Sequence, residues 1–308
     1  MNEKQNTPEL SGILIIDKPT GITSHDVVWK VRKLFGTKKV GHTGTLDPLA
    51  SGVLVVLIGR AAKAAEYLVC DDKKYSATLR LGLTTDTEDI TGEVLTTHVG
   101  DLPKQNAVID ACSKFVGNIK QIPPMYSALK VDGKKLYELA REGKTVEREA
   151  RDITVFSLEA TPADALSDYT LDVHCSSGTY IRTLCADIGA SLGCGGVMAS
   201  LRRTSAGGFD IDDATTLDAL EQMTMIEREA LLLPVDSLFS TLEAVKLPAF
   251  YEKLCRNGCE IYQKKIKTVF ATGTRVRLCT ADGRFFALGE VRDFDDGSAI
   301  KAIKFFEI

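Results

Sequence analysis

Residues 41–48 read Gly41-His42-Thr43-Gly44-Thr45-Leu46-Asp47-Pro48. The two glycines and the proline break the periodicity of the flanking sequence, which predicts an ordered loop with unusual backbone angles. Before the loop, apolar residues recur at helical spacing after Ser24, which predicts an amphipathic helix with Ser24 as its N-cap. After the loop, the continuous apolar run Val53–Ile58 predicts a buried strand. We therefore expect ligand-facing side chains in this loop, between the helix and the strand.

The remaining elements alternate irregularly between strand and helix. Ile13–Ile16 predicts a buried strand, and alternating apolar residues predict half-buried strands that open at Tyr75 and Tyr169. Helical periodicity predicts further helices, at residues 61–68, 106–115, 134–142 and 181–192. Because this is not the regular strand–helix alternation of a parallel sheet, we expect an α+β fold with a mixed, mainly antiparallel sheet flanked by helices.

The pattern changes toward the C-terminal end of the chain. After Pro234, and again after Pro248, short strand-like segments surround four glycines, Gly273, Gly283, Gly289 and Gly297. This pattern predicts a small β-rich domain. We therefore expect one large domain at residues 10–240 and a small one at residues 246–308.

The composition is that of an ordinary soluble globular protein, with 44% hydrophobic and 26% charged residues. The polar start Met1–Leu10 lacks the features of a signal peptide, and no apolar stretch approaches the roughly 20 residues that span a bilayer. We therefore expect a cytoplasmic protein that does not bind membranes. The eight cysteines suit reduced, buried thiols. Cys255 and Cys259 lack a second pair of ligands at a matching distance, so we expect no metal site.

Charge is distributed unevenly along the chain. The net charge of −4 argues weakly against a nucleic-acid partner. However, residues 26–45 contain five basic side chains and one acidic one, and residues 251–277 contain seven and two. Such runs are usually solvated surface, although two separated basic stretches also suit phosphate contacts. The acidic segment Asp86–Gly92 has Ile90 where a calcium loop needs its third ligand, so we expect no calcium there.

Single residues carry little chemical information by themselves. An aspartate before a proline, such as Asp47, most often bonds nearby backbone amides, although this one follows a basic helix. Arg182, at the apolar start of a helix, must reach solvent or meet a carboxylate. Tyr75 and Tyr180 lie on apolar faces, where tyrosines are usually core residues. A lone histidine such as His42 is usually an ordinary loop residue.

Together, several segments resemble the TruB family of pseudouridine synthases. Residues 41–54 are similar to the catalytic-loop motif of that family at nearly every position. Further blocks stand in the family's order over about residues 12 to 208, namely Ile13–Pro19 with Gly21, Thr23 and Ser24, then Gln121–Ala128, Gly178–Leu184 and Leu201–Thr204. The region from about Leu247 resembles the small PUA-type RNA-binding domain of bacterial members.

This resemblance implies an isomerase that converts the T-loop uridine of tRNA (position 55) into pseudouridine. The reaction breaks the N1–C1′ bond, turns the uracil and rejoins it through C5. A base inside a folded T-loop must first be flipped out. The resemblance makes Asp47 the catalytic residue, because a carboxylate can trap or stabilise the electron-poor C1′ or remove a 2′ proton. It implies no cofactor.

The resemblance also assigns substrate-binding roles. Arg182 pairs with Asp47 and keeps it ionised and oriented, against the burial that would raise its pKa. Tyr75 stacks on the target base and assists removal of the C5 proton, and Leu201 packs on the other side of the base.

Three further residues receive supporting roles. Tyr180 supports the pocket, His42 fills the space that the flipped base leaves, and Lys18 gives structural support near the site. Residues 121–151 match an RNA-gripping insertion. The implied partner is the T-arm stem-loop of tRNA, and we expect a monomer.

One position departs from the family pattern. The chain has Gly196-Val197 where many members have alanine followed by histidine or tyrosine. The change precedes Leu201 and alters the expected packing of the pocket wall. It does not touch Asp47, so we expect activity to survive.

Three other functions fit parts of the sequence. A non-catalytic tRNA-binding or tRNA-folding protein would not require Asp47, Tyr75 and Arg182 together. The catalytic subunit of guide-RNA-directed particles is expected to carry longer, more basic terminal extensions than a chain that ends at Ile308. A nucleosidase using Asp47 would need neither the two basic stretches nor a terminal β-rich domain.

Overall fold

The computed structural model of the protein describes residues 10–67, 72–127, 129–131 and 133–306. Four expectations extend outside these residues: the polar start at Met1, the end of a helix at Leu68, the end of the insertion motif at Ala128, and the end of the small domain at Ile308.

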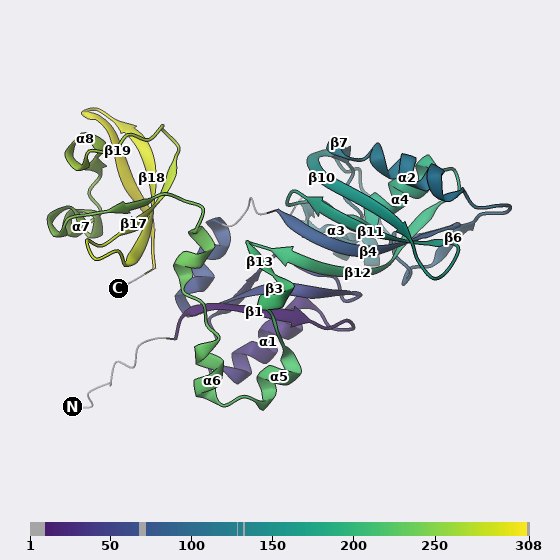
Figure 1. Ribbon diagram of the computed structural model, residues 1–308, viewed down its shortest axis with the longest axis horizontal. Coiled ribbons are helices and arrows are strands. Elements are labelled where there is room, and N and C mark those ends of the chain that lie inside the picture. The colour runs from purple at the N-terminus through teal and green to yellow at the C-terminus, as the bar shows by residue number, and fades with distance from the viewer. Residues whose placement is uncertain (1–9, 68–71, 128, 132, 307–308) are drawn as a thin grey trace.

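A ten-stranded sheet forms the centre of the larger part of the molecule (Figure 1). Its main path runs in the order β14-β1-β3-β12-β4-β11-β10-β7, with β2 added on β3 and β13 on β12. The strands are β1 (Gly12–Lys18), β2 (Val40–Thr43), β3 (Ala50–Ile58), β4 (Lys73–Leu81), β7 (Gly117–Gln121), β10 (Arg151–Pro162), β11 (Asp168–Cys175), β12 (Gly196–Ala206), β13 (Phe209–Asp210) and β14 (Thr215–Thr216).

All pairings within this sheet are antiparallel except β1 with β14 and β3 with β12. The expected mixed, mainly antiparallel α+β fold is therefore confirmed. Two small hairpins accompany the sheet, β5 (Leu83–Thr85) with β6 (Val94–Thr97), and β8 (Lys130–Val131) with β9 (Lys134–Lys135).

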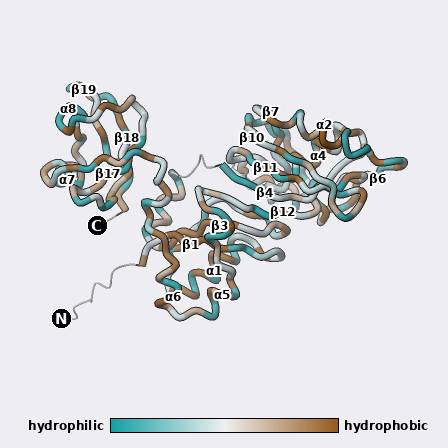
Figure 2. The backbone as a smooth tube through the Cα atoms, in the orientation of Figure 1, coloured by the Kyte–Doolittle hydropathy of each residue, from teal (hydrophilic) through white to brown (hydrophobic). Residues whose placement is uncertain are grey.

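Helices cover both halves of the large sheet. Helix α1 (Ser24–Leu34) and the short helix α5 (Leu217–Gln222) pack on β1 and β3 through aliphatic side chains. Helices α2 (Gln105–Ser113) and α4 (Ile181–Ser191) pack on β4, β10, β11 and β12. Figure 2 shows mainly hydrophobic residues along β1 and the strands beside it. Burial of these faces is the main stabilising contribution.

The C-terminal part forms a separate five-stranded sheet in the order β15-β17-β18-β19-β16 (Figure 1). Its strands are β15 (Ala244–Lys246), β16 (Ile261–Tyr262), β17 (Arg275–Cys279), β18 (Phe285–Phe294) and β19 (Gly297–Phe305), joined by helices α7 (Ala249–Arg256) and α8 (Gln263–Ile266). A small apolar cluster connects the two parts, with Ala64 and Phe239 on one side and Leu288 and Phe306 on the other.

The other helical elements are α3 (Leu136–Arg141), α6 (Met225–Ala230) and the 3₁₀ segments η1 (Gly59–Tyr67), η2 (Ile211–Asp213) and η3 (Val235–Phe239). None of the helices in the described part of the chain is long and apolar enough to cross a membrane.

Several local predictions were wrong in detail. Thr23, not Ser24, is the N-cap of α1, and it forms a capping box with Asp26. The predicted loop at 41–48 is shorter than expected, because Gly41, His42 and Thr43 belong to β2. The alanine-rich segment is a 3₁₀ rather than an α-helix, and Tyr75 is the third residue of its strand rather than the first.

Candidate active site

Asp47 lies in the loop between β2 and β3, near the middle of the large sheet. Because Thr23 caps α1, the hydroxyl of Ser24 is available to fix this loop. It donates to the Leu46 carbonyl (3.0 Å) and accepts from the Leu46 amide (2.8 Å). The amide of Gly21 donates to the carbonyl of Pro48 over 2.8 Å. Gly21, between β1 and α1, and Ser24, the first residue of α1, therefore hold the loop on both sides of Asp47.

Arg203 holds the same loop from the opposite side. It is a fully buried residue of β12. Its Nη2 donates to the carbonyl of Gly44 (3.0 Å), and its Nε donates to the carbonyl of Val53 (2.7 Å). Gly44 has a φ of 70°, in the left-handed region that favours glycine. One buried guanidinium thus ties the start of the loop to the strand that follows it.

Arg182 is the direct partner of Asp47. Its Nε lies 3.0 Å from Oδ2 of Asp47, and the side chain of Arg182 is 6% exposed whereas that of Asp47 is 39% exposed. Of the two alternatives open to this arginine, solvent or a carboxylate, the structure shows the carboxylate, that of Asp47. Since the cation is buried and the carboxylate opens to solvent, the pair presents Asp47 toward whatever occupies the site.

The buried side of Arg182 is surrounded by acceptors. Nη1 donates to the carbonyl of Thr87 (3.2 Å), and Nη2 donates to the carbonyl of Tyr126 (2.7 Å). A second carboxylate, that of Asp89, lies 3.9 Å from Nη1. Asp89 is itself fixed by the hydroxyls of Thr87 and Thr91 and by the Thr91 amide. Arg182 is therefore oriented before any ligand arrives.

Glu88 joins the segment of Asp89 to helix α4. Its backbone φ is 62°, unfavourable for a residue other than glycine. Its carboxylate accepts a 2.6 Å hydrogen bond from the hydroxyl of Thr183, the residue after Arg182. Burial raises the pKa of Glu88. The strained backbone is the kind of feature that collects at functional sites.

The surroundings of Asp47 shift the pKa of its carboxyl in both directions. Burial raises the pKa of its carboxyl above the usual range, and the negative charge of Asp89 adds to this effect. The positive charges of Arg182 and Lys18 oppose it. Lys18, at the end of β1, is fully buried and donates to the carbonyls of Pro19 and Ile22. Burial lowers the pKa of Lys18 to about 8.

Tyr75 and Leu201 form an apolar wall near the loop. Both are buried and belong to one cluster with Leu46 of the loop. Residue 201 pairs with Ala50, the first residue after the loop, so β12 brings this wall next to Asp47. Burial raises the pKa of Tyr75, although the neighbouring cation of Arg203 opposes the shift. A neutral phenol is therefore available at neutral pH.

His42 lies in β2, two residues before Gly44 of the loop, with its ring partly buried. Burial lowers its pKa, and the positive charges of Arg203 and His25 lower it further. Its Nδ1 is buried, and no described residue hydrogen-bonds to it. The imidazole is therefore neutral at neutral pH, and its buried Nδ1 keeps an unused capacity for a hydrogen bond within the described part of the protein.

Tyr180 occupies the N-cap of α4, two residues before Arg182. The backbone amide of Tyr180 donates to Oε1 of Gln121 (2.8 Å). Nε2 of Gln121 donates in return to the backbone carbonyl of Tyr180 (3.0 Å). Among the described residues, no hydrogen bond or ion pair joins Tyr180 or His42 to Asp47. Because Gln121 is the first residue of the expected insertion, its two bonds with Tyr180 attach the insertion to the helix that carries Arg182.

The departure at residue 196 has a clear packing consequence. A Cβ at Gly196 would lie 2.8 Å from the carbonyl oxygen of Cys185, and one at Gly189 would lie 2.1 Å from the Gly196 amide nitrogen. The two glycines let α4 lie directly on β12. An alanine at 196 would force these elements apart.

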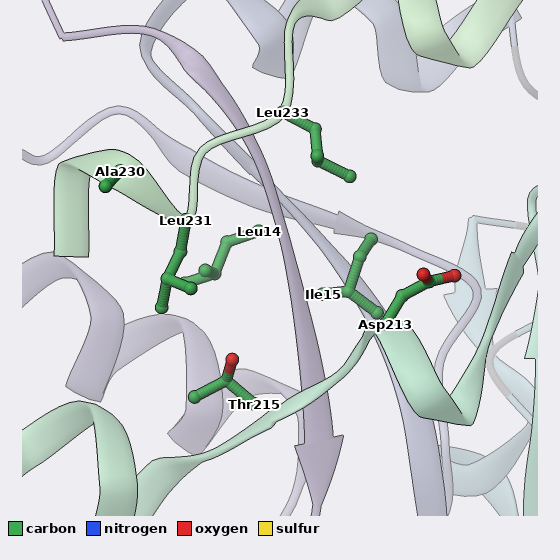
Figure 3. Close-up of a pocket in the computed structure, with 7 residues that line it drawn as sticks. All are labelled: Leu14, Ile15, Asp213, Thr215, Ala230, Leu231 and Leu233. Atoms are coloured by element: carbon green, nitrogen blue, oxygen red, sulfur yellow. The ribbon is translucent and has the colours of Figure 1, made fainter. Parts of the chain in front are cut away.

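A separate cavity of about 220 Å³ lies beside β1 (Figure 3). Its lining is Leu14, Ile15, Asp213, Thr215, Ala230, Leu231 and Leu233, none of which belongs to the candidate active site. In the described part of the chain, no group of three or more histidine, cysteine or acidic side chains is placed to hold a metal ion.

Sequence reasoning missed four contributors, Asp89, Glu88, Arg203 and Gln121. The segment of Asp89 was considered only as a calcium loop. A better signal was available: threonines stand two residues before and two after Asp89, where their hydroxyls can bond to its carboxylate and orient it. Arg203 stood in a matched block without a role, because nothing in a strand pattern predicts that a guanidinium turns inward.

The chain matches two family models. The N-terminal domain model of the TruB family pseudouridylate synthases matches residues 32–181, and the C-terminal domain model of tRNA pseudouridylate synthase B matches residues 182–240.

Curated relatives are similar over most of their length. The tRNA pseudouridine synthase B of Burkholderia mallei (strain NCTC 10247) is 46% identical, over 92% of this chain and 94% of its own. That of Alkaliphilus oremlandii is 44% identical, over 93% and 95%. That of Syntrophotalea carbinolica is 50% identical, over 73% and 74%.

Solved structures share the fold. The chain superimposes on one in the crystal structure of a Cbf5-Nop10-Gar1 complex with a TM-score of 0.71 and 26% identity, covering 96% of this chain and 84% of that one. The archaeal box H/ACA Nop10-Cbf5 complex gives a TM-score of 0.70 at 24% identity, covering 96% and 86%.

Proposed function

Because this chain belongs to the TruB family of tRNA pseudouridine synthases, we propose that it isomerises the T-loop uridine of tRNA, position 55, with Asp47 as its catalytic carboxylate. The observation that carries the proposal is the ion pair between Asp47 and Arg182. It gives an accessible carboxylate held by a buried, fully anchored cation.

In the proposed reaction the carboxylate of Asp47 acts at the ribose of the flipped uridine. It either bonds to C1′ or removes the 2′ proton, and in both cases the N1–C1′ bond breaks and the bond electrons leave with the uracil. The uracil turns and C5 bonds to C1′, while Asp47 either leaves C1′ or returns the proton to C2′, so that its charge is restored. The C5 proton is then lost, and N1 gains one. Atoms and charge therefore balance without a further reactant.

The neighbours of Asp47 suit supporting roles in this reaction. Arg182 favours the ionised carboxylate, which burial alone would disfavour. Tyr75 and Leu201 offer the apolar surface on which a base can stack. His42 offers a neutral ring with a spare nitrogen for the space that the base vacates. Lys18 adds a positive charge close enough to act on Asp47.

We further propose how the chain divides its work. Residues 10–240 form the catalytic domain, with an RNA-gripping insertion at about 121–151, and residues 246–308 form a PUA-like RNA-binding domain. The basic stretches at 26–45 and 251–277 supply phosphate contacts to the T-arm. The protein acts as a cytoplasmic monomer without a cofactor.

An unmodified tRNA transcript tests the target directly. After incubation with the protein, pseudouridine is mapped by carbodiimide adduct formation and primer extension. A matched transcript with cytidine at the T-loop position serves as the control. We expect one new stop at the T-loop uridine and none in the control. Modification elsewhere would overturn the proposed target, and binding without modification would favour a non-catalytic tRNA-folding protein.

A further inference from the structure

Trp29 is the one tryptophan in the sequence, and it is 59% exposed in the middle of helix α1. The opposite face of this helix, with Val27, Val28 and Val31, is buried against β1 and β3. A large aromatic side chain gains stability from burial, so one left in solvent beside a well-packed face points to a contact with something outside the chain.

Trp29 belongs to a stripe of three exposed residues, His25, Trp29 and Lys33. Their spacing of four places them on one side of the helix, along about 12 Å of its length. The ammonium of Lys33 lies 5.8 Å from the centre of the Trp29 ring. The stripe therefore combines a flat apolar surface with a positive charge above it.

The stripe begins at the candidate active site. Ser24, directly before His25, is bonded in both directions to Leu46, the neighbour of Asp47. His25 is also close enough for its charge to act on His42. The stripe therefore starts one residue from a direct contact with the loop that carries Asp47.

The charges around the stripe favour an anionic partner. The carboxylate of Asp26 is occupied by the amide and hydroxyl of Thr23. Lys30 pairs with Glu221, and Arg32 donates to a carbonyl of β2. Lys33 stays over the ring, and Lys38 is exposed beyond the end of the helix. An aromatic face with cations around it suits the stacked base and phosphate of an RNA.

We propose that this stripe binds the substrate RNA outside the reacting nucleotide, with Trp29 stacked on an unpaired base and Lys33 beside a neighbouring phosphate. The inference rests on the proposed function, since it takes tRNA as the ligand. Its role is to add affinity and not to take part in the chemistry, because the stripe lies on α1 rather than in the loop of Asp47.

The lone tryptophan makes the test direct. The Asp47→Asn protein, which is expected to bind without turnover, is titrated with two probes, an unmodified tRNA transcript and an isolated T-arm hairpin, while tryptophan fluorescence is followed. Quenching by both probes places the stacked base in the T-arm, and quenching by the tRNA alone places it elsewhere in the tRNA. Either supports the proposal. Unchanged fluorescence at saturation of both overturns it.

Variants of the wild-type enzyme supply the second measurement. Trp29→Ala should raise the Kd and KM for tRNA by about 5- to 150-fold with kcat unchanged, the range for loss of one stacked base. Lys33→Ala should lower the slope of log Kd against log salt by about one. Leu166→Ala, at a side chain 98% exposed in the turn between β10 and β11, is the control for loss of surface apolar area.

The outcomes separate this inference from the function on which it rests. If tRNA is bound but never isomerised, the proposed function fails, while the fluorescence and Kd values still decide the role of Trp29. If tRNA is isomerised and Trp29→Ala matches the Leu166→Ala control, only the stripe is overturned. A change of sedimentation in Trp29→Ala would make the stripe a contact between copies of the chain, which also overturns the proposal.

Discussion

The Nε atom of Arg182 lies 3.0 Å from Oδ2 of Asp47, and the arginine is nearly buried while the aspartate faces solvent. The rest of the guanidinium is held by the carbonyls of Thr87 and Tyr126. Asp47 is therefore aimed by a cation that has little freedom to move. A group fixed before the substrate arrives needs no reorganisation during the reaction.

Replacing Arg182 with methionine should lower kcat by at least about 100-fold, the size seen when one preorganised electrostatic partner is removed. Arg182→Lys keeps the positive charge but cannot bond to Asp47, Thr87 and Tyr126 at once. Its kcat should therefore lie between that of Arg182→Met and that of the wild type. Pseudouridine formation under saturating tRNA measures both. Arg80→Met, which removes an arginine paired with Asp168, is the control. An unchanged kcat in Arg182→Met would refute the role assigned to the pair.

Glu88→Gly separates stability from activity. Glycine relieves the positive φ of residue 88, worth roughly 1 kcal/mol or more, and loses the buried hydrogen bond from Thr183, worth about 1–3 kcal/mol. We expect thermal stability to change little and kcat to fall about 10-fold, because α4 is no longer locked beside Arg182. Glu88→Gln keeps an acceptor oxygen and should retain more activity. Equal activity in all three proteins would show that this contact does not position Arg182.

Arg203→Lys tests how the loop is held. Lysine keeps a positive charge but reaches one carbonyl rather than both Gly44 and Val53. The loop of Asp47 should loosen, so that kcat falls about 10-fold or more while the Kd for tRNA changes little. The neighbouring Arg202→Lys, which alters a partly exposed pair with Asp17, is the control. A raised Kd at normal kcat would instead make Arg203 a binding residue.

The buried Lys18 predicts a pH dependence of stability. Its pKa is about 8 in the folded protein and about 10.4 when unfolded. Between these values the unfolded chain binds more protons, so the free energy of unfolding rises with pH. Lys18→Met lacks this gain. The stability of wild type minus that of Lys18→Met should grow by on the order of 1–2 kcal/mol from pH 7.5 to 9.5 in urea unfolding. If this difference in unfolding free energy stayed constant with pH, folding would not lower the pKa of Lys18.

The sequence predicted those parts of the molecule that depend on local pattern. The amphipathic α1, the buried β3 and the irregular loop between them follow from apolar spacing and from glycine and proline. For Arg182 the pattern left two alternatives, solvent or a carboxylate, and only the resemblance named Asp47 as its partner.

What the sequence did not predict depends on contacts between distant segments. Asp89 and Arg182 are brought together only by the packing of α4 on β12, and that close approach needs the glycines at 189 and 196. Ser24 was predicted to cap its own helix, whereas it bonds Leu46, 22 residues away. Local propensity cannot choose between such partners, because the competing bond exists only in the folded chain.

The most direct test of the central claim is tritium release from a T-arm transcript labelled at C5 of its uridines, comparing wild type with Asp47→Asn. Forming the C5–C1′ bond expels the C5 hydrogen, so release reports the isomerisation itself. We predict release by wild type and none above background by Asp47→Asn, with both proteins binding the transcript. Release by Asp47→Asn at the wild-type rate would contradict the assignment of Asp47 as the catalytic carboxylate.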